Sequence, residues 1–465
     1  MKKSHSPLTT THSLFPILCS LLIAHCSFVP SLFAQEAPSP RTPDSIETVR
    51  LNTVKYGTET EIAALIQTLR TEGEDYLDDE IIALVENTRN QRILSGAFSF
   101  FGEREKSGLE GRAIRAIEER NEERNETIVA AIDYLGRVKA VNAAPVLQKV
   151  IEDGERRFIN AAFRAFGRVS GADADGAAEY LIDYYENRSP DDENRREMIV
   201  AIGATGSASA VEFLAGVVSD NSARPTLRMA ALESISKIGD QSGLEAVLAG
   251  VSADDPNVRA AAVAALGPFS GEAVDEAILD AFRDSNFRSR SAAAQASRER
   301  RLVAAIPYLK FRAERDEVPA VRDDSIRALG AIADSESVQI LEGLFSERKN
   351  SDRVRIISGE MIMQIDSGRF LDRFVMELED AKQKNQTALY NALLRILGGT
   401  KGPGMETITR RLMQDRGVVE RSYALDMAAN NGLTGLSEEI KLITSDRNES
   451  LASKARRTLE KLGIQ

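Results

Sequence analysis

One stretch of the chain decides its fold: it reads Asp255-Pro256-Asn257-Val258-Arg259-Ala260-Ala261-Ala262-Val263-Ala264-Ala265-Leu266-Gly267. A similar stretch runs from Ala320 to Gly330, and another runs from Thr226 to Ser236. Each carries an apolar residue followed by arginine, then small or apolar residues at helical spacing, and ends in an aliphatic residue and a small one. The three stretches therefore predict one amphipathic helix that is used repeatedly.

The register of this helix recurs along most of the chain. The place of Gly267 is taken in successive units by Gly136, Gly167, Gly203, Ser236, Gly267, Arg298, Gly330, Met363, Arg395, Ala428 and Glu460. The spacing averages about 32 residues, which is the length of a two-helix repeat. The residue just before this position is large and apolar in every unit except the one with Ser297. This regularity indicates a repeat protein.

Each unit is predicted to be a helix, a turn and a second helix. We expect glycine or a short polar stretch to end the first helix, because glycine adopts the left-handed conformation at little cost. Turns such as Asp254-Asp255-Pro256 and Asp284-Ser285-Asn286 supply N-caps for the next first helix. One unit cannot bury its own apolar face, so neighbours must stack. The pattern predicts an all-α solenoid of about 12–13 stacked two-helix repeats.

The repeats also divide the chain into segments. These are residues 45–125 with divergent N-terminal repeats, residues 126–446 with regular repeats, and residues 447–465 with a charged capping helix. Within the first segment we predict one unit around 46–69 with its turn near Gly57, and another around 93–117 with its turn near Gly102.

The N-terminus has the layout of a secretory signal peptide, which we assign to residues 1–34. Lys2 and Lys3 give a positive start, the run from Leu14 to Phe33 is mostly apolar, and no acidic residue precedes Glu36. A short apolar run after a positive start is typical of export signals. The chain is therefore expected to be exported, to the periplasm or the cell surface.

Cleavage is expected after Ala34, which leaves residues 35–44 as a proline-rich disordered tether. Two alternatives stay open, namely a lipid anchor on Cys26 and an uncleaved apolar anchor. In the cleaved form we expect no transmembrane span.

Cleavage would remove every cysteine and every histidine of the chain, which are Cys19, Cys26, His5, His12 and His25. The mature chain could then form no disulfide, no Ser-His-Asp triad, no Cys-His pair and no ordinary zinc site. We accordingly expect no catalytic residue, no metal and no cofactor. The full chain has a net charge of -12, which argues against nucleic acid as a partner because phosphates require a basic surface.

These residues resemble the HEAT-repeat family, in the bacterial form called PBS-lyase HEAT-like repeats. The resemblance rests on Asp255–Gly267, on Val321-Arg322 with the run from Leu329 to Asp334, and on Ile238-Gly239-Asp240. It covers nearly all of 46–465. It implies a binding scaffold, because such repeats serve mostly in binding. Some relatives are enzymes, a di-iron hydroxylase and bilin lyases, but the hydroxylase needs histidine ligands that the mature chain would lack.

Two sets of arginines are candidate functional residues. The first is an arginine ladder at one register position near the start of successive first helices: Arg195, Arg228, Arg259, Arg290, Arg322 and Arg355. Two interpretations of the ladder stay open. In the first, its arginines pair with acidic turn residues and so join neighbouring units; the candidate partners include Asp254, Asp284, Asp316 and Asp352. In the second, they form a row that binds the carboxylates of a ligand.

The second set belongs to a basic island between Arg283 and Arg315, which holds nine basic and three acidic residues. Its partner-binding candidates are Arg288, Arg298, Arg300, Arg301, Arg312 and Arg315. The island also breaks the repeat rule at Ser297-Arg298. It is either a solvated helix face or a site for an acidic protein or an anionic polymer.

The chain is therefore predicted to be a non-catalytic, exported α-solenoid that binds a protein partner along its curved surface. The alternatives are an envelope assembly or structural factor and, further off, a carboxylate-based hydrolase or lyase-like enzyme. Two groups of aromatic residues are interpreted either as packing residues or as an exposed binding patch; they are Phe98, Phe100 and Phe101, and Tyr180, Tyr184 and Tyr185.

Overall fold

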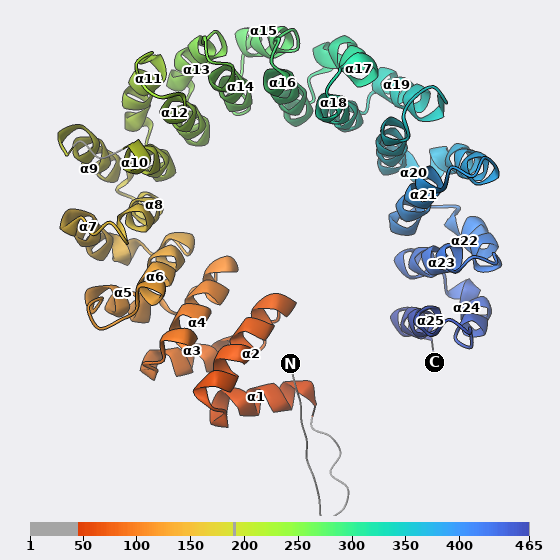
Figure 1. The fold of residues 1–465 in the computed structure, drawn as a ribbon, viewed down its shortest axis with the longest axis horizontal. Coiled ribbons are helices and arrows are strands. Elements are labelled where there is room, and N and C mark those ends of the chain that lie inside the picture. The colour runs from red at the N-terminus through yellow and green to blue at the C-terminus, as the bar shows by residue number, and fades with distance from the viewer. Residues whose placement is uncertain (1–44, 189–191, 465) are drawn as a thin grey trace, which may run out of the picture.

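The computed structural model describes residues 45–188 and 192–464. The predicted signal peptide, the proline-rich tether and Cys26 lie outside these residues. In the part described, the chain forms 25 α-helices and five short 3-10 helices, with no strand. The helices follow one another around an open arch (Figure 1), which confirms the predicted all-α solenoid.

The concave side of the arch is lined by one helix from each unit. These inner helices are α2 (Glu59–Glu72), α4 (Gln91–Glu103), α6 (Asn125–Arg137), α8 (Ile159–Val169), α10 (Asp192–Thr205), α12 (Pro225–Ile238), α14 (Pro256–Ala265), α16 (Phe287–Arg300), α18 (Pro319–Ile332), the first half of α20 (Asp352–Gln383), α21 (Thr387–Gly399), α23 (Val418–Asn431) and α25 (Glu449–Lys461).

The convex side is formed by the second helix of each unit. These outer helices are α3 (Asp78–Asn87), α5 (Glu110–Glu118), α7 (Ala144–Asp153), α9 (Ala174–Asn187), α11 (Val211–Ser219), α13 (Leu244–Val251), α15 (Glu272–Ala281), α17 (Ile306–Arg315), α19 (Ser335–Ser346), the second half of α20, α22 (Met405–Met413) and α24 (Ser437–Ile443). Helix α1 (Ile46–Tyr56) precedes them and packs on α2 and α3. The described chain thus has twelve pairs followed by the single inner helix α25.

Local sequence explains where the inner helices begin. The Asp255 side chain caps α14 by accepting hydrogen bonds from the backbone N–H groups of Asn257 and Val258, with Pro256 at the first helical position. Asn286 caps α16 in the same way through the N–H of Arg288. The predicted acidic and asparagine-rich turns therefore act as caps at these two helices.

The glycines of the repeat register have a different role from the one predicted. Gly136, Gly167 and Gly203 lie in the last turn of α6, α8 and α10, but they are helical and none has the left-handed conformation predicted for a terminating glycine. A Cβ atom added to Gly136 would lie 2.8 Å from Cα of Ala165 on α8, and one added to Gly167 would overlap the backbone of Ala201 on α10. These glycines are small because consecutive inner helices approach closely. The left-handed residue that ends α12 is Gly239, three positions after the register position.

The N-terminal units largely follow the prediction. The turn of the 93–117 unit lies at 104–109, close to the predicted place near Gly102, which is itself helical. The 46–69 unit is present as predicted, since α1 packs on α2 and the turn between them lies at Gly57. Helix α3, which follows α2, is an element that the repeat pattern did not reveal. At α20 the turn between inner and outer helix shrinks to a kink, where Asp366 has non-helical torsion angles (φ -156°, ψ 88°).

One hydrophobic core runs through the whole stack, from Val54 to Ala455. Phe98, Phe100 and Phe101 are each at most 1% exposed in this core. Tyr180, Tyr184 and Tyr185 are partly buried against it, and Tyr185 meets Phe213 with ring centroids 5.1 Å apart. The aromatic residues therefore pack within and between units.

Candidate partner-binding face

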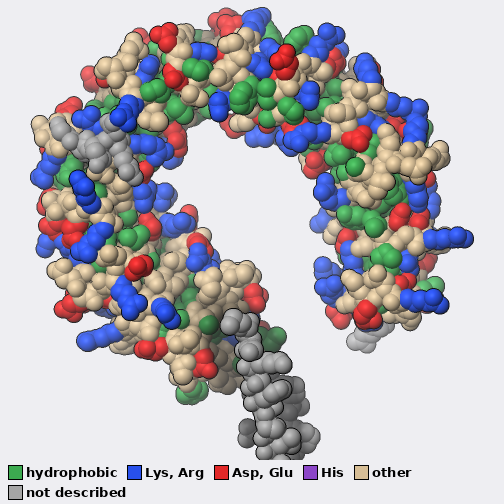
Figure 2. Space-filling model, viewed as in Figure 1, with side chains coloured by type: hydrophobic (Ala, Val, Ile, Leu, Met, Phe, Trp, Pro, Cys, Tyr) green, Lys and Arg blue, Asp and Glu red, His purple; other side chains and the backbone are tan. Residues whose placement is uncertain are grey.

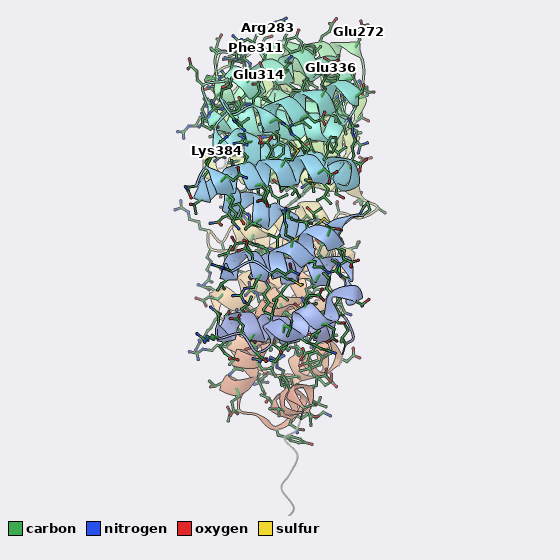
Figure 3. All side chains as sticks on the ribbon, turned by 90° about the vertical axis from the view of Figure 1, so that its right-hand side faces the viewer. Glu272, Arg283, Phe311, Glu314, Glu336 and Lys384 are labelled. Carbon is green, nitrogen blue, oxygen red and sulfur yellow. The ribbon has the colours of Figure 1, made fainter. Side chains whose placement is uncertain are left out.

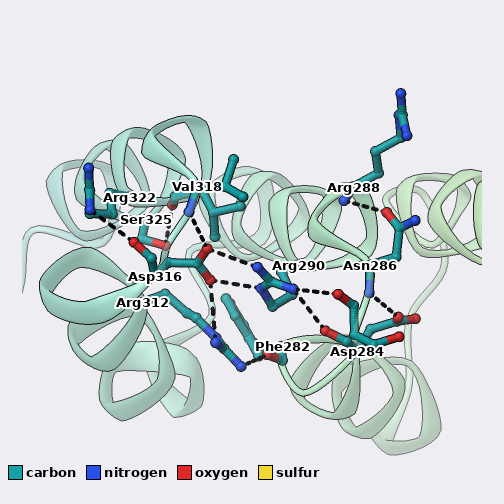
Figure 4. A network of polar contacts seen from close by, with 12 residues as sticks. Phe282, Asp284, Asn286, Arg288, Arg290, Arg312, Asp316, Val318, Arg322 and Ser325 are labelled. Carbon is teal, nitrogen blue, oxygen red and sulfur yellow. Dashed lines mark hydrogen bonds and ion pairs between the residues drawn. The ribbon is translucent and has the colours of Figure 1, made fainter.

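The central members of the arginine ladder bind acidic turns of the following unit. Arg259 donates to both carboxylate oxygens of Asp284, at 2.8 and 3.1 Å, and Arg290 donates to both of Asp316, at 2.7 and 2.9 Å. Arg290 also donates to the backbone carbonyls of Asp284 and Ser285, at 3.0 Å each (Figure 4). Each guanidinium therefore joins two successive turns of the solenoid.

The other ladder arginines are also held inside the structure. Arg228 donates to the carbonyl of Val218 and Arg322 to that of Asp316. Arg355 is 1% exposed and donates to the carbonyl of Phe345 and to Glu377, which takes the role expected of Asp352. Arg195 lies over the ring of Tyr185 with its Nε unbonded among the described residues.

The ladder ion pairs hold carboxylates in the charged form. The hydrogen bond from Arg259 is the main cause that lowers the pKa of Asp284 to about 2. Burial alone would raise the pKa of Asp316, but the bonds from Arg290 and from the N–H of Val318 bring it below its ordinary value. The carboxylate of Asp316 also accepts from Arg312, at 3.3 Å.

The structure divides the basic island into three groups. Arg300 and Arg312 are half-buried, bonded to Asp275 and Asp316 and to backbone carbonyls. Arg288, Arg298 and Arg301 are exposed on α16 and its C-cap, at the inner side of the arch.

The last member, Arg315, is exposed on the outer helix α17, where it lies over the ring of Phe311. Figure 3 shows Phe311 at the crown of the arch among Arg283, Glu314 and other charged residues. The six candidates consequently do not form one continuous patch.

The charge of the two sides of the arch differs strongly. The outer helices α3 to α24 carry 12 basic and 28 acidic residues, a net charge of -16. The inner helices carry 24 basic and 17 acidic residues, a net charge of +7, when α10 is counted from Asn194 and the kink residue Asp366 is assigned to neither side. Even without the six ladder arginines the inner helices would be close to neutral. Figure 2 shows lysine and arginine side chains along the inner wall.

Grooves between inner helices interrupt this inner face, and two of them are wide enough to hold several side chains. One lies between α12 and α14, has a volume of about 380 Å³, and is lined mainly by Met229, Ala230, Ala261, Ala264 and Ala265. It is hollow because α14 presents only alanines there. Its charged lining is Arg196 and Glu233, so it has no net charge of its own.

The other groove lies between α20 and α21 and has a volume of about 570 Å³. Its apolar lining is Ile356, Met363 and Ile396, and its charged lining is Glu360, Arg395 and Lys401. Arg395 and Lys401 are exposed, and their side chains make no hydrogen bond or ion pair with any described residue.

Sequence reasoning missed this second site although a signal was present. Arg395 takes the register position that glycine or another small residue holds in most units, as Arg298 does in the basic island. The departure at Arg395 did not stand out because the sequence around it is not a basic run.

Other kinds of site are not apparent in the described residues. Residues 45–188 and 192–464 contain no group of three or more acidic, histidine or cysteine side chains placed to hold a metal ion. Nor do any of their helices combine the length and the apolar character needed to cross a membrane.

Comparisons with solved structures find helical solenoids. Among them are Kap121p alone, the karyopherin Kap121p bound to the extreme C-terminus of the protein phosphatase Cdc14p, and Kap121p bound to Ste12p. Their identities to this chain are 12%, 12% and 13%, with TM-scores of 0.44, 0.45 and 0.43. The matches cover 89%, 89% and 90% of this chain and 53% of each of theirs, so the chain spans about half their length.

The sequence itself places the chain more directly. No curated protein matches it. The model of one family, described as "Spirochaete HEAT repeat protein", matches residues 54–458, which is nearly the whole described stack. This match confirms the HEAT-repeat resemblance, while the PBS-lyase form of it stays a prediction. The chain belongs to the spirochaete HEAT repeat protein family.

Proposed function

We propose that this chain is an exported, non-catalytic scaffold that binds a protein partner with an acidic surface on the inner face of its arch. The observation that carries the proposal is the charge contrast between the two sides, -16 on the outer helices against +7 on the inner ones. An acidic partner is repelled by the convex side and meets no such repulsion inside. Contrast of this kind sets the orientation and rate of association.

The polar groups of the inner face support binding rather than chemistry. Residues 27–465 contain neither histidine nor cysteine, the side chains most often used as catalytic bases and nucleophiles near neutral pH. The two inner grooves are lined by apolar residues with a few charged ones, as recognition sites commonly are.

Photo-crosslinking tests the proposal in cells that produce the full chain. A photoreactive amino acid is placed at Gln364 or Ala264 on the inner face, or at Glu336 or Lys149 on outer helices. We expect a partner adduct of one defined mass from the inner positions only, containing a protein with an acidic surface, and less adduct at high salt because charges are screened. Adducts from outer positions only, or from none, would contradict the proposal.

The export part of the proposal rests on the apolar N-terminal run and its two lysines. N-terminal sequencing of the protein recovered from the cell envelope checks it. We expect a start near Gln35; a chain that begins at Met1 and stays in the cytosolic fraction would contradict export.

A further inference from the structure

We infer that the groove between α20 and α21 binds an extended, acidic segment of the protein partner, with an apolar side chain beside the acidic one. The inference rests on the proposed function and gives it a specific site. The groove combines what such a segment needs, because Ile356, Met363 and Ile396 offer apolar contact while Arg395 and Lys401 offer charge.

The loop that carries Lys401 is held in place from both sides. Asn431 on α23 accepts a hydrogen bond from the N–H of Gly402, at 3.0 Å, and donates one to the carbonyl of Thr400, at 2.9 Å. The Ser367 hydroxyl on α20 donates to the carbonyl of Lys401 itself, at 3.0 Å. The backbone on both sides of Lys401 is therefore fixed before any ligand arrives, which lowers the entropy cost of binding.

The kink in α20 contributes to the same arrangement. Because Asp366 breaks the helix without a longer turn, Ser367 follows directly and meets the loop of the next unit. Gly368 packs so closely on Pro403 of this loop that an added Cβ would lie 2.8 Å from the Pro403 ring. A unit that departs from the repeat rule thus positions the loop.

Charge decides which occupant fits the groove. Most arginines of the stack are bonded to carboxylates or carbonyls, whereas Arg395 and Lys401 have no such partner among the described residues. Against these two cations the groove has one acidic residue, Glu360. A volume of about 570 Å³ holds a few side chains, not a folded domain. An acidic strand of a partner protein matches both the charge and the size.

Selection from a random twelve-residue peptide library against the full chain tests the inference. We expect the selected peptides to be rich in Asp and Glu next to apolar residues. Reversing both cations, with Arg395→Glu and Lys401→Glu, should weaken their binding at least about tenfold, because it turns attraction into repulsion. Asn431→Ala should weaken binding less, by releasing the loop and not the charges.

A matched double variant, Lys149→Glu with Lys310→Glu, reverses two exposed lysines on the outer helices α7 and α17. It should bind the peptides as the parent does. All variants should keep the helical circular dichroism of the parent, since the reversed side chains are exposed. Selected peptides that are neutral, or that bind the Arg395/Lys401 variant as tightly as the parent, would overturn the inference.

Two further outcomes are informative. Polyphosphate is a second probe. If polyphosphate binding depends on Arg395 and Lys401 while no peptide depends on them, the groove belongs to an anionic polymer and the inference is overturned. The selected peptides could instead bind the charge-reversed variant as tightly as the parent while the inner-face positions still crosslink a partner. In that case the inference fails and the scaffold function stands. Absence of inner-face crosslinks would instead remove the function itself.

Discussion

At the scale of single residues, the arginines of this chain fall into two groups according to what surrounds them. Arg259 and Arg290 form ion pairs with the acidic turn of the following unit, so their side chains join repeats and are not available to a ligand. Arg298 and Arg395 stand at a later register position on the inner helices, where the described neighbours offer no carboxylate bond. The same residue type is thus structural at the ladder position of Arg259 and Arg290 and free for binding at the later register position of Arg298 and Arg395.

The Arg259–Asp284 pair predicts a dependence of stability on pH. The pKa of Asp284 falls from 3.8 to about 2 in the folded chain, so folding favours its charged form. The resulting stabilisation, about 2 kcal/mol, is complete well above pH 4 and is lost as the pH falls through 2. Asp284→Asn should lower the free energy of unfolding at pH 7 by roughly this amount, and the difference from the parent should shrink toward pH 2.

Denaturant unfolding at a series of pH values measures this difference. Asp372→Asn is the control, since the side chain of Asp372 is exposed and makes no hydrogen bond or ion pair with any described residue. It should match the parent at all pH values. A constant gap between the Asp284→Asn variant and the parent from pH 7 to pH 2 would mean that the ion pair does not stabilise the fold.

At the scale of elements, the stack depends on how closely consecutive inner helices approach. The backbone of α8 at Gly167 packs directly on α10 at Ala201, and Gly203 packs in the same way on Ser234 of α12. The repeat register correctly indicated that a small residue is needed at these positions. It did not indicate why, because a sequence carries no distance between helices, and so the glycines were interpreted as helix ends.

Gly167→Ala should therefore destabilise the chain, by about 1–3 kcal/mol, because the new methyl group meets backbone that cannot move aside. Gly343→Ala is the matched control. Gly343 also lies inside a helix, α19, but nothing stands within 4 Å of an added Cβ. Alanine there should stabilise by about 0.5–1 kcal/mol through helix propensity. Thermal unfolding compares the two, and equal shifts for both variants would refute the close-packing role.

Some elements were beyond the reach of the repeat pattern. Helix α3 was missed because residues 70–92 do not carry the arginine and small-residue signature of the regular units. The kink at Asp366 replaces the turn that the neighbouring units make at 333–334 and at 400–404. The groove between α20 and α21 depends on both this kink and the loop at Lys401, so only the folded chain brings its residues together.

At the scale of the whole molecule, the arch is one continuous core in which each unit contacts chiefly its neighbours along the chain. The fold class and the approximate number of units were predictable because stacking imposes the same apolar register on every unit. The charge contrast between the two sides was not predicted. It becomes visible only when each helix is assigned to the inner or the outer side, since the net charge of -12 averages over both.

This architecture predicts how damage spreads. Leu266 is fully buried directly after α14, so Leu266→Asp places an unpaired carboxylate in the core at a cost of several kcal/mol. Because stability in a stack is a sum of unit and neighbour terms, amide exchange should accelerate in α12, α14 and α16 while the two ends of the arch stay protected.

Ala264→Asp is the control. Ala264 is exposed on α14, so this variant should leave amide exchange unchanged. A uniform acceleration along the whole chain would mean that the arch unfolds as one cooperative unit, and unchanged exchange in the Leu266→Asp variant would contradict the buried register itself.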